Sequence, residues 1–349
     1  MRALPLLVFG LSTFGSIQAR ASEAAFSADG KTLRVLSTQA PVLLSFKLGD
    51  PTPVKTPLPK EMAGEDGASA LLADPQGLLV AGGGKLWLWN PADPKVGPKA
   101  VAPLPPQFYV GGISRAEGKG IAGMIMLSGF HSVDPKKPLP KDVYAETTLY
   151  GMKPGGKGFL SVFVRRLRTI TACPAFGGER MVFGGDNDLW EGGLEVEEDL
   201  TERAGSLWGH RSAPLAMANT DSGNSGGMGV RSVVIAGSNV WAALGGHLMG
   251  ALVSVPLSAK PAVEDHPDLA ESWKVQHDQL ALAKAVQLPP AQGEQPSDII
   301  ESVDALCAWN SPNGEWKVAF RADHKTFWLL EKGAKEPKRI GSELPREGN

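Results

Sequence analysis

Residues 24–36 read AAFSADGKTLRVL, and this short stretch decides the fold. An apolar run leads into the dipeptide Asp29-Gly30, and a second run alternates apolar and polar residues after it. Asp-Gly is a strong signal for a tight β-hairpin turn, because glycine accepts the positive φ angle that such a turn demands. The stretch therefore predicts two short antiparallel strands joined by a turn.

The same outline recurs along the chain, each time as an apolar strand that runs into a turn. Glycine (42 residues) and proline (28 residues) are abundant enough for many short strands and tight turns, and long amphipathic helices are scarce. The further copies lie at residues 70–82, 113–123, 173–183, 233–243 and 307–319.

Several copies continue with two more strand-like segments. Third strands are expected at residues 85–89 and 326–330. Four antiparallel strands per repeat around a ring is the plan of a β-propeller, in which each four-stranded sheet is a blade. The sequence thus predicts an all-β fold, a single β-propeller of four-stranded blades. The repeats are compatible with six or seven blades, and we expect six. Fourth strands with proline-rich exits are expected at residues 54–59, 100–105, 285–290 and 339–345.

Two of the turns carry a family resemblance. FSADGK at residues 26–31 and WNSPNG at residues 309–314 resemble the SPDGK turn of TolB-like and WD-type β-propeller repeats. The WD dipeptide of the second type is absent from the chain. The resemblance implies the propeller fold and says little about function, because propellers host unrelated activities.

The first 21 residues have the features of a secretory signal peptide. Arg2 supplies the positive charge, residues 3–14 are almost entirely apolar, and Ala19-Arg20-Ala21 matches the small-x-small cleavage pattern. An apolar run of this length is too short to span a bilayer, which needs about 20 residues. We expect cleavage after Ala21, a propeller domain over residues 22–349, and a periplasmic or secreted location.

The charge balance limits the classes of partner. The chain has 35 basic and 37 acidic residues, whereas a nucleic-acid-binding protein needs a strong basic excess. The apolar run at residues 230–257 contains Arg231, Asn239 and several glycines, which favour strands and turns over a membrane span. We expect a monomer that binds a protein or a small molecule, with neither nucleic acid nor a membrane span.

The two cysteines are expected to be free. Cys173 and Cys307 each fall on the first strand of their repeat, and a whole repeat separates them. Cysteines whose Cα atoms lie more than about 7 Å apart cannot form a disulfide bond. The sequence therefore predicts two buried thiols, although an exported protein with an even number of cysteines often forms disulfides.

Two interruptions of the repeat supply the candidate binding surface. Residues 258–282 predict a short helical insert in the fifth blade, which either covers the ring or docks a partner, and Trp273 lies on its apolar stripe. A loop rich in glycine, serine and asparagine leads into the same blade near the channel mouth. The surface candidates are Asp221, Asn224 and Arg231, with Trp273 from the insert.

Two functions are compatible with these features. The first is a non-catalytic exported scaffold that needs no cofactor and binds its ligand at the channel mouth or its partner on the insert. The alternative is a metal-dependent hydrolase of the lactonase type, with calcium or another hard cation in the central channel bound by carboxylate oxygens. Repeat position alone nominates Glu23, Asp66, Asp221 and Asp304 as its ligands. The sequence favours the scaffold, because it contains no recognisable catalytic set.

Overall fold

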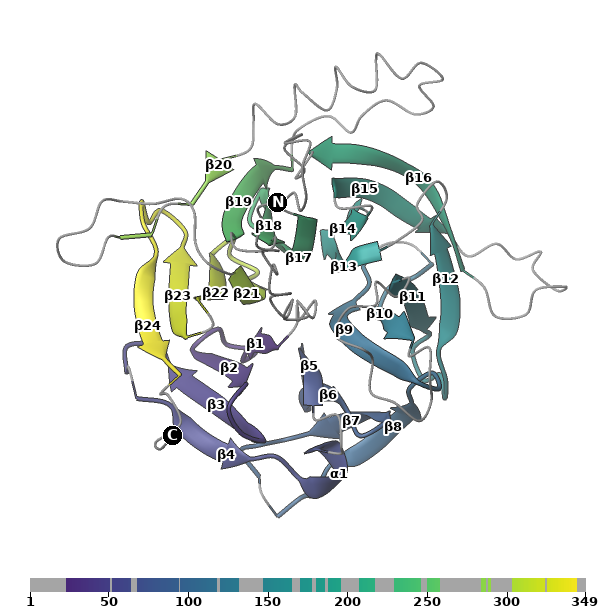
Figure 1. Cartoon of the computed structure of the whole chain (residues 1–349), viewed down its shortest axis with the longest axis horizontal. Coiled ribbons are helices and arrows are strands. Elements are labelled where there is room, and N and C mark those ends of the chain that lie inside the picture. The colour runs from purple at the N-terminus through teal and green to yellow at the C-terminus, as the bar shows by residue number, and fades with distance from the viewer. Residues whose placement is uncertain are drawn as a thin grey trace, which may run out of the picture.

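The structure is a computed structural model of the 349-residue chain, and its β-sheets stand around a central axis (Figure 1). The first strand of each repeat lies nearest the axis, and the later strands lie progressively farther out. The described residues are 23–50, 52–63, 68–93, 95–117, 120–131, 147–164, 170–177, 180–185, 188–195, 207–216, 229–245, 250–257, 284–286, 288–289, 303–323 and 325–343.

Four of the five sheets are four-stranded, and in each the strands follow one another in chain order. The first contains β1 (Ala24–Phe26), β2 (Thr32–Leu36), β3 (Val42–Lys47) and β4 (Val54–Pro57). The second contains β5 (Ala68–Asp74), β6 (Gly77–Gly82), β7 (Lys85–Trp89) and β8 (Lys99–Pro103). The other two contain β17 (Gly229–Ala236), β18 (Asn239–Gly245), β19 (Gly250–Pro256) and β20 (Lys284–Ala285), and β21 (Val303–Asn310), β22 (Trp316–Ala322), β23 (Thr326–Glu331) and β24 (Lys338–Ser342).

The fifth sheet has eight strands and consists of two antiparallel meanders. The first contains β9 (Phe108–Arg115), β10 (Ile125–His131), β11 (Thr147–Met152) and β12 (Leu160–Val164). The second contains β13 (Ile170–Gly177), β14 (Arg180–Gly185), β15 (Asp188–Glu195) and β16 (Leu207–Ala216). The outermost strands β12 and β16 pair in parallel and join the two meanders, with Phe163 opposite Trp208.

The prediction of an all-β propeller is confirmed, but the prediction of six separate blades is corrected to five sheets. The reason is the β12–β16 pairing, which merges two successive meanders. Strand β12 reads LSVFV, with no charge or proline to discourage a neighbour. The outer strands β4, β8 and β24 instead carry lysine or proline, which protect a free sheet edge from pairing.

The first and last sheets close the ring through side chains. In the part of the chain that the structure describes, these two sheets share no strand pairing. An apolar cluster fills the space between them, and the rings of Phe46 and Phe327 pack at a centroid distance of 4.9 Å in its middle. Ala24, Phe26 and Cys307 of the innermost strands belong to the same cluster. Burial of apolar surface therefore contributes to the closure.

Helix is nearly absent from the described residues, which contain the single turn α1 (Lys60–Ala63) and no helix long and apolar enough to cross a membrane. The predicted helical insert at residues 258–282 lies outside the described residues. The third copy of the repeat, at residues 113–123, departs from the predicted pattern of strand, turn and second strand. Its residues 121–123 form a turn, because Ala116 N–H bonds to Met124 O at 2.7 Å, and β10 begins only at Ile125.

Candidate functional site

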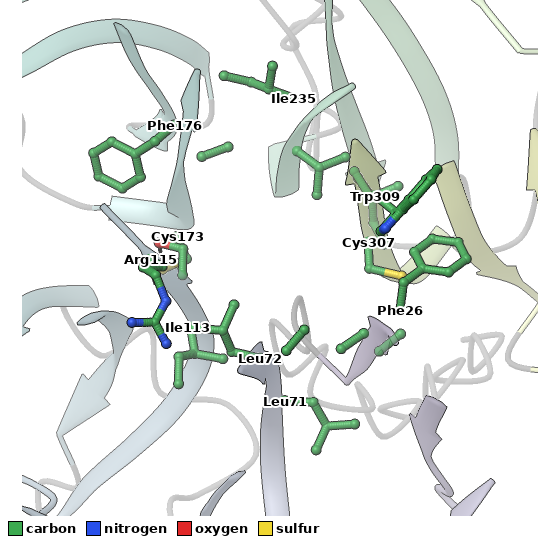
Figure 2. A pocket seen from close by; sticks show the side chains of 18 of the residues that line it. Phe26, Leu71, Leu72, Ile113, Arg115, Cys173, Phe176, Ile235, Cys307 and Trp309 are labelled. Carbon is green, nitrogen blue, oxygen red and sulfur yellow. Dashed lines mark hydrogen bonds between the residues drawn. The ribbon is translucent and has the colours of Figure 1, made fainter. Parts of the chain in front are cut away.

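A cavity of about 290 Å³ lies at the axis of the ring. The innermost strands β1, β5, β9, β13, β17 and β21 all contribute to its wall, mainly through the half of each strand that leads into the second strand. Figure 2 shows this wall, with Phe26 and Trp309 on one side and Cys173 and Phe176 on the other. The loop that the sequence predicts at the ligand site leads into the start of the first strand of its blade. The cavity lies where the first strands end, so it is at the opposite end of the channel.

The cavity lies beside a set of contacts that we call the tryptophan end of the junction between the first and last sheets. Trp309 Nε1 donates a hydrogen bond to Ala28 O at 2.9 Å, and Lys317 Nζ donates one to Gly30 O at 2.8 Å. The ammonium of Lys317 also lies 5.3 Å from the centroid of the Trp309 ring. The hairpin that resembles the SPDGK turn in the last sheet thus holds the corresponding turn of the first.

Glycine is required at two turns that meet tryptophan rings. Gly30 has φ +64°, and a Cβ atom there would lie 2.5 Å from Trp309 Cδ2. Gly237 has φ +60°, and its Cβ would lie 2.5 Å from Trp316 Cδ1. Both the backbone conformation and the close ring therefore exclude a larger side chain.

The other end of the same junction, which we call the ionic end, is built around one buried guanidinium. Arg321 on β22 is 0% exposed. Its Nη2 donates to Glu23 Oε2 at 2.5 Å and its Nε to Asp304 Oδ1 at 2.6 Å. Its Nη1 lies 3.4 Å from Glu343 Oε2. One cation thus connects carboxylates from the start of β1, from β21 and from the segment after β24.

Glu343 extends this network to the first sheet. It accepts hydrogen bonds from the Ser37 hydroxyl and from Thr38 N–H, the second at 2.9 Å. Both donors lie in the turn between β2 and β3, about 300 residues away in the sequence. The carboxylate is 7% exposed, so it is largely shielded from water. Charge-assisted hydrogen bonds of this kind are stronger than neutral ones.

Burial by itself would lower the pKa of Arg321, but the nearby charges of Asp304 and Glu23 outweigh that effect and raise the pKa above its ordinary value. The guanidinium is therefore charged at every pH at which the protein is folded. A buried carboxylate can remain ionised where a cation compensates it. Arg321 provides that compensation at the ionic end.

The structure brings together two of the four predicted metal ligands, but around a different cation. Glu23 and Asp304 both bind the Arg321 guanidinium. Asp66 and Asp221 lie outside the described residues. Within the residues that the structure does describe, no group of three or more histidine, cysteine, aspartate or glutamate side chains is placed to hold a metal ion. Sequence reasoning missed Arg321, since no motif surrounds it.

Only one of the predicted surface residues falls in the described part of the chain. Arg231 lies on β17, is partly buried, and directly precedes the stretch of that strand that lines the cavity. Asp221, Asn224 and Trp273 lie outside the described residues.

The prediction for the cysteines is confirmed, because both are buried free thiols. Burial raises the pKa of Cys173 to about 11 and also raises the pKa of Cys307. Both groups line the cavity, on β13 and β21. The thiolate is the nucleophilic and metal-binding form of cysteine, and neither residue supplies it at neutral pH.

Comparisons with known proteins support the fold and nothing finer. No protein-family model and no curated protein sequence matches the chain. A solved structure provisionally assigned as a gluconolactonase is similar, with 13% identity, a TM-score of 0.52, and coverage of 93% of this chain and 90% of that one. The β-propeller domain of Cps50 (Swd1) from Myceliophteria thermophila gives 12% identity, coverage of 91% and 84%, and a TM-score of 0.45. At such identities a likeness shows the fold alone, and at the level of the fold the chain is a β-propeller.

Proposed function

We propose that the protein is an exported, non-catalytic β-propeller that serves as a binding or assembly scaffold for a small molecule or a protein. The observation that carries this proposal is a pair of buried ion pairs. The Arg321 guanidinium lies 2.5 Å from a carboxylate oxygen of Glu23 and 2.6 Å from one of Asp304. A metal-dependent hydrolase would need such carboxylate oxygens for its cation. Here the same oxygens are committed to closing the ring.

The two thiols and the apolar wall of the cavity also support a non-catalytic function. The two thiols that line the cavity are held in the protonated form by burial. The cavity wall is mostly apolar and belongs to rigid inner strands, an arrangement that suits binding better than proton transfer. Export rests on the leader-like residues 1–21 and on the cleavage pattern that ends at Ala21.

Metal content and turnover test the scaffold against the hydrolase. The protein is purified without chelator and analysed by mass spectrometry for bound elements, then assayed against a panel of lactones and esters before and after treatment with EDTA. We expect no stoichiometric divalent ion and no chelator-sensitive turnover. One equivalent of calcium, together with turnover that EDTA removes and calcium restores, would overturn the proposal.

Export is tested separately on the full-length chain. It is expressed in a Gram-negative host, the periplasm is separated from the cytoplasm, and the N-terminus is sequenced. We expect a periplasmic protein that begins at Ser22. Replacing Ala19 and Ala21 with arginine removes the small side chains that the signal peptidase needs, so the leader is retained. A cytoplasmic protein that keeps residues 1–21 in the unmodified chain would contradict the prediction.

A further inference from the structure

The walls of the axial cavity contain very little charge. Among the residues that the structure describes, the charged ones that line it are Arg115 and Glu117. The Arg115 guanidinium donates to Asp74 Oδ2 at 2.5 Å, so its charge is already compensated. Glu117 also takes part in an interaction of its own. An ionic ligand would lose its hydration in this cavity without gaining an uncommitted counter-charge, and that loss is costly.

The polar side chains of the wall are also engaged with the protein. The Asn310 side chain donates to Ile235 O at 2.9 Å and accepts from Gly237 N–H at 2.9 Å. Trp309 Nε1 is bonded to Ala28 O, and Ser114 Oγ lies 3.5 Å from Cys173 Sγ. Each of these groups thus already has a partner within the protein, which a polar ligand would have to share or displace.

Apart from Ser27, Ser232 and the two cysteines, the remaining wall consists of aliphatic and aromatic side chains. Figure 2 shows Leu72, Ile113 and Ile235 on different inner strands around the same space. The volume of about 290 Å³ lies at the lower end of the range of ligand pockets, which is about 300–1,000 Å³. That size suits a molecule of two or three small rings rather than a folded protein segment.

We propose that the axial cavity binds a small, uncharged, largely apolar molecule. The ligand gains free energy by leaving water for the apolar wall, and a charged group on it weakens binding. The channel-facing edges of the inner strands pair with no other strand in the described residues and can orient one or two polar atoms of the ligand. This inference rests on the proposed binding function and names the chemistry of its ligand.

Two fluorescent probes with the same ring system provide the test. N-phenyl-1-naphthylamine is neutral, and 8-anilinonaphthalene-1-sulfonate adds one sulfonate. We expect the neutral probe to bind the folded protein with one-to-one stoichiometry, and the sulfonate to bind at least about tenfold more weakly. Absence of saturable binding by the neutral probe, or equal affinity for the two probes, would overturn the inference.

Variants locate the binding site. Ala73 and Ala28 both line the cavity, and Ala28 lies on an exposed turn where a larger side chain does not disturb the core. Ala73→Leu and Ala28→Leu should each weaken binding of the neutral probe by at least about fivefold, because they fill the cavity or its mouth. Ala334→Leu, on an exposed turn between β23 and β24, is the matched control and should leave the affinity unchanged.

The outcomes for the two proposals are distinct. Unchanged affinity in a folded Ala28→Leu protein would show that the probe binds elsewhere and would overturn the cavity inference. The scaffold proposal would remain, because a protein partner can dock on another surface. Chelator-sensitive turnover would instead overturn the scaffold proposal, whatever the probes do.

Discussion

The two ends of the junction between the first and last sheets hold the ring by different physics. At the ionic end, the fully buried Arg321 meets Glu23, Asp304 and Glu343. At the tryptophan end, Trp309 and Lys317 reach the turn around Gly30 through two hydrogen bonds and a ring contact. The ionic contacts are shielded from water, whereas Trp309 is only partly buried.

This difference determines how each end can fail. Removing one partner of a buried ion pair leaves charges in a medium of low polarity, so the cost is large and depends on pH. Disturbing the tryptophan end costs packing and one or two hydrogen bonds, so the cost is smaller and nearly independent of pH. The junction is therefore strong at both ends but sensitive to charge at only one.

The largest expected effect comes from Arg321→Met, which keeps an unbranched apolar stem and removes the guanidinium. Three carboxylates then face one another without the cation that connects them, and we expect a loss of about 3–5 kcal/mol in the free energy of unfolding at neutral pH. Urea denaturation followed by circular dichroism measures this loss. The exposed Lys325→Met, at the turn after β22, is the matched control and should cost less than about 0.5 kcal/mol.

Acidification distinguishes this explanation from a simple packing defect. Protonation removes the repulsion between carboxylates that no cation compensates. The stability difference from the unmodified protein should therefore shrink as the pH is lowered from neutral into the acidic range. A difference that stays constant over this range would show that the side chain of Arg321 acts through its volume alone.

The next largest effect is expected for Gly30→Ala at the tryptophan end. The added Cβ lies 2.5 Å from the Trp309 ring and sits on a backbone with φ +64°. We expect a loss of about 2–4 kcal/mol, from left-handed strain and overpacking together. Gly333→Ala is the control, because φ is +80° there and nothing lies within 4 Å of the added Cβ. Equal losses in the two variants would show that the Trp309 contact contributes nothing.

The two turns of the tryptophan end could be predicted from the sequence, but not the contacts between them. The dipeptides Asp29-Gly30 and Asn313-Gly314 are local signals that predict these turns. Elsewhere in the chain, strand β7 (Lys85–Trp89) also lies where the sequence predicts it. The turn after β9 could not be placed as well, because the hydrogen bonds of Ala116 with Met124 O and Gly123 N–H extend it beyond the expected length. Local signals thus predict where hairpins occur better than where their second strands begin.

The ionic end could not be predicted from the sequence. Its members come from four separate segments, and the functional interpretation of Glu23 and Asp304 as metal ligands followed from their repeat positions alone. Nothing near Arg321 in the sequence marks it as their partner. The parallel pairing of β12 with β16 could not be predicted either. These two outer strands are more than 40 residues apart, and neither carries a local signal for the pairing. Long-range electrostatics and edge pairing require the folded structure.

The ionisation of the two buried thiols influences the free energy of unfolding only at alkaline pH. Burial raises the pKa of Cys173 to about 11, above the ordinary value that applies in the unfolded chain, and raises that of Cys307 as well. The stabilisation from keeping these thiols protonated is complete below the unfolded pKa and is lost as the pH rises through the folded pKa. The free energy of unfolding should therefore fall above about pH 9. In a Cys173→Ala, Cys307→Ala protein this part of the fall should be missing.

The same thiols can report whether the junction opens by itself. Cys307 belongs to the apolar cluster between the first and last sheets, whereas Cys173 belongs to a cluster within the eight-stranded sheet. At pH 8 we expect a thiol-reactive disulfide reagent to modify neither residue in the unmodified protein, because both are buried and protonated. In Gly30→Ala, which weakens only the junction, Cys307 should react several times faster than Cys173, as measured by peptide mass spectrometry. Equal rates for the two thiols would mean that the ring unfolds as one cooperative unit, and that the junction does not open by itself.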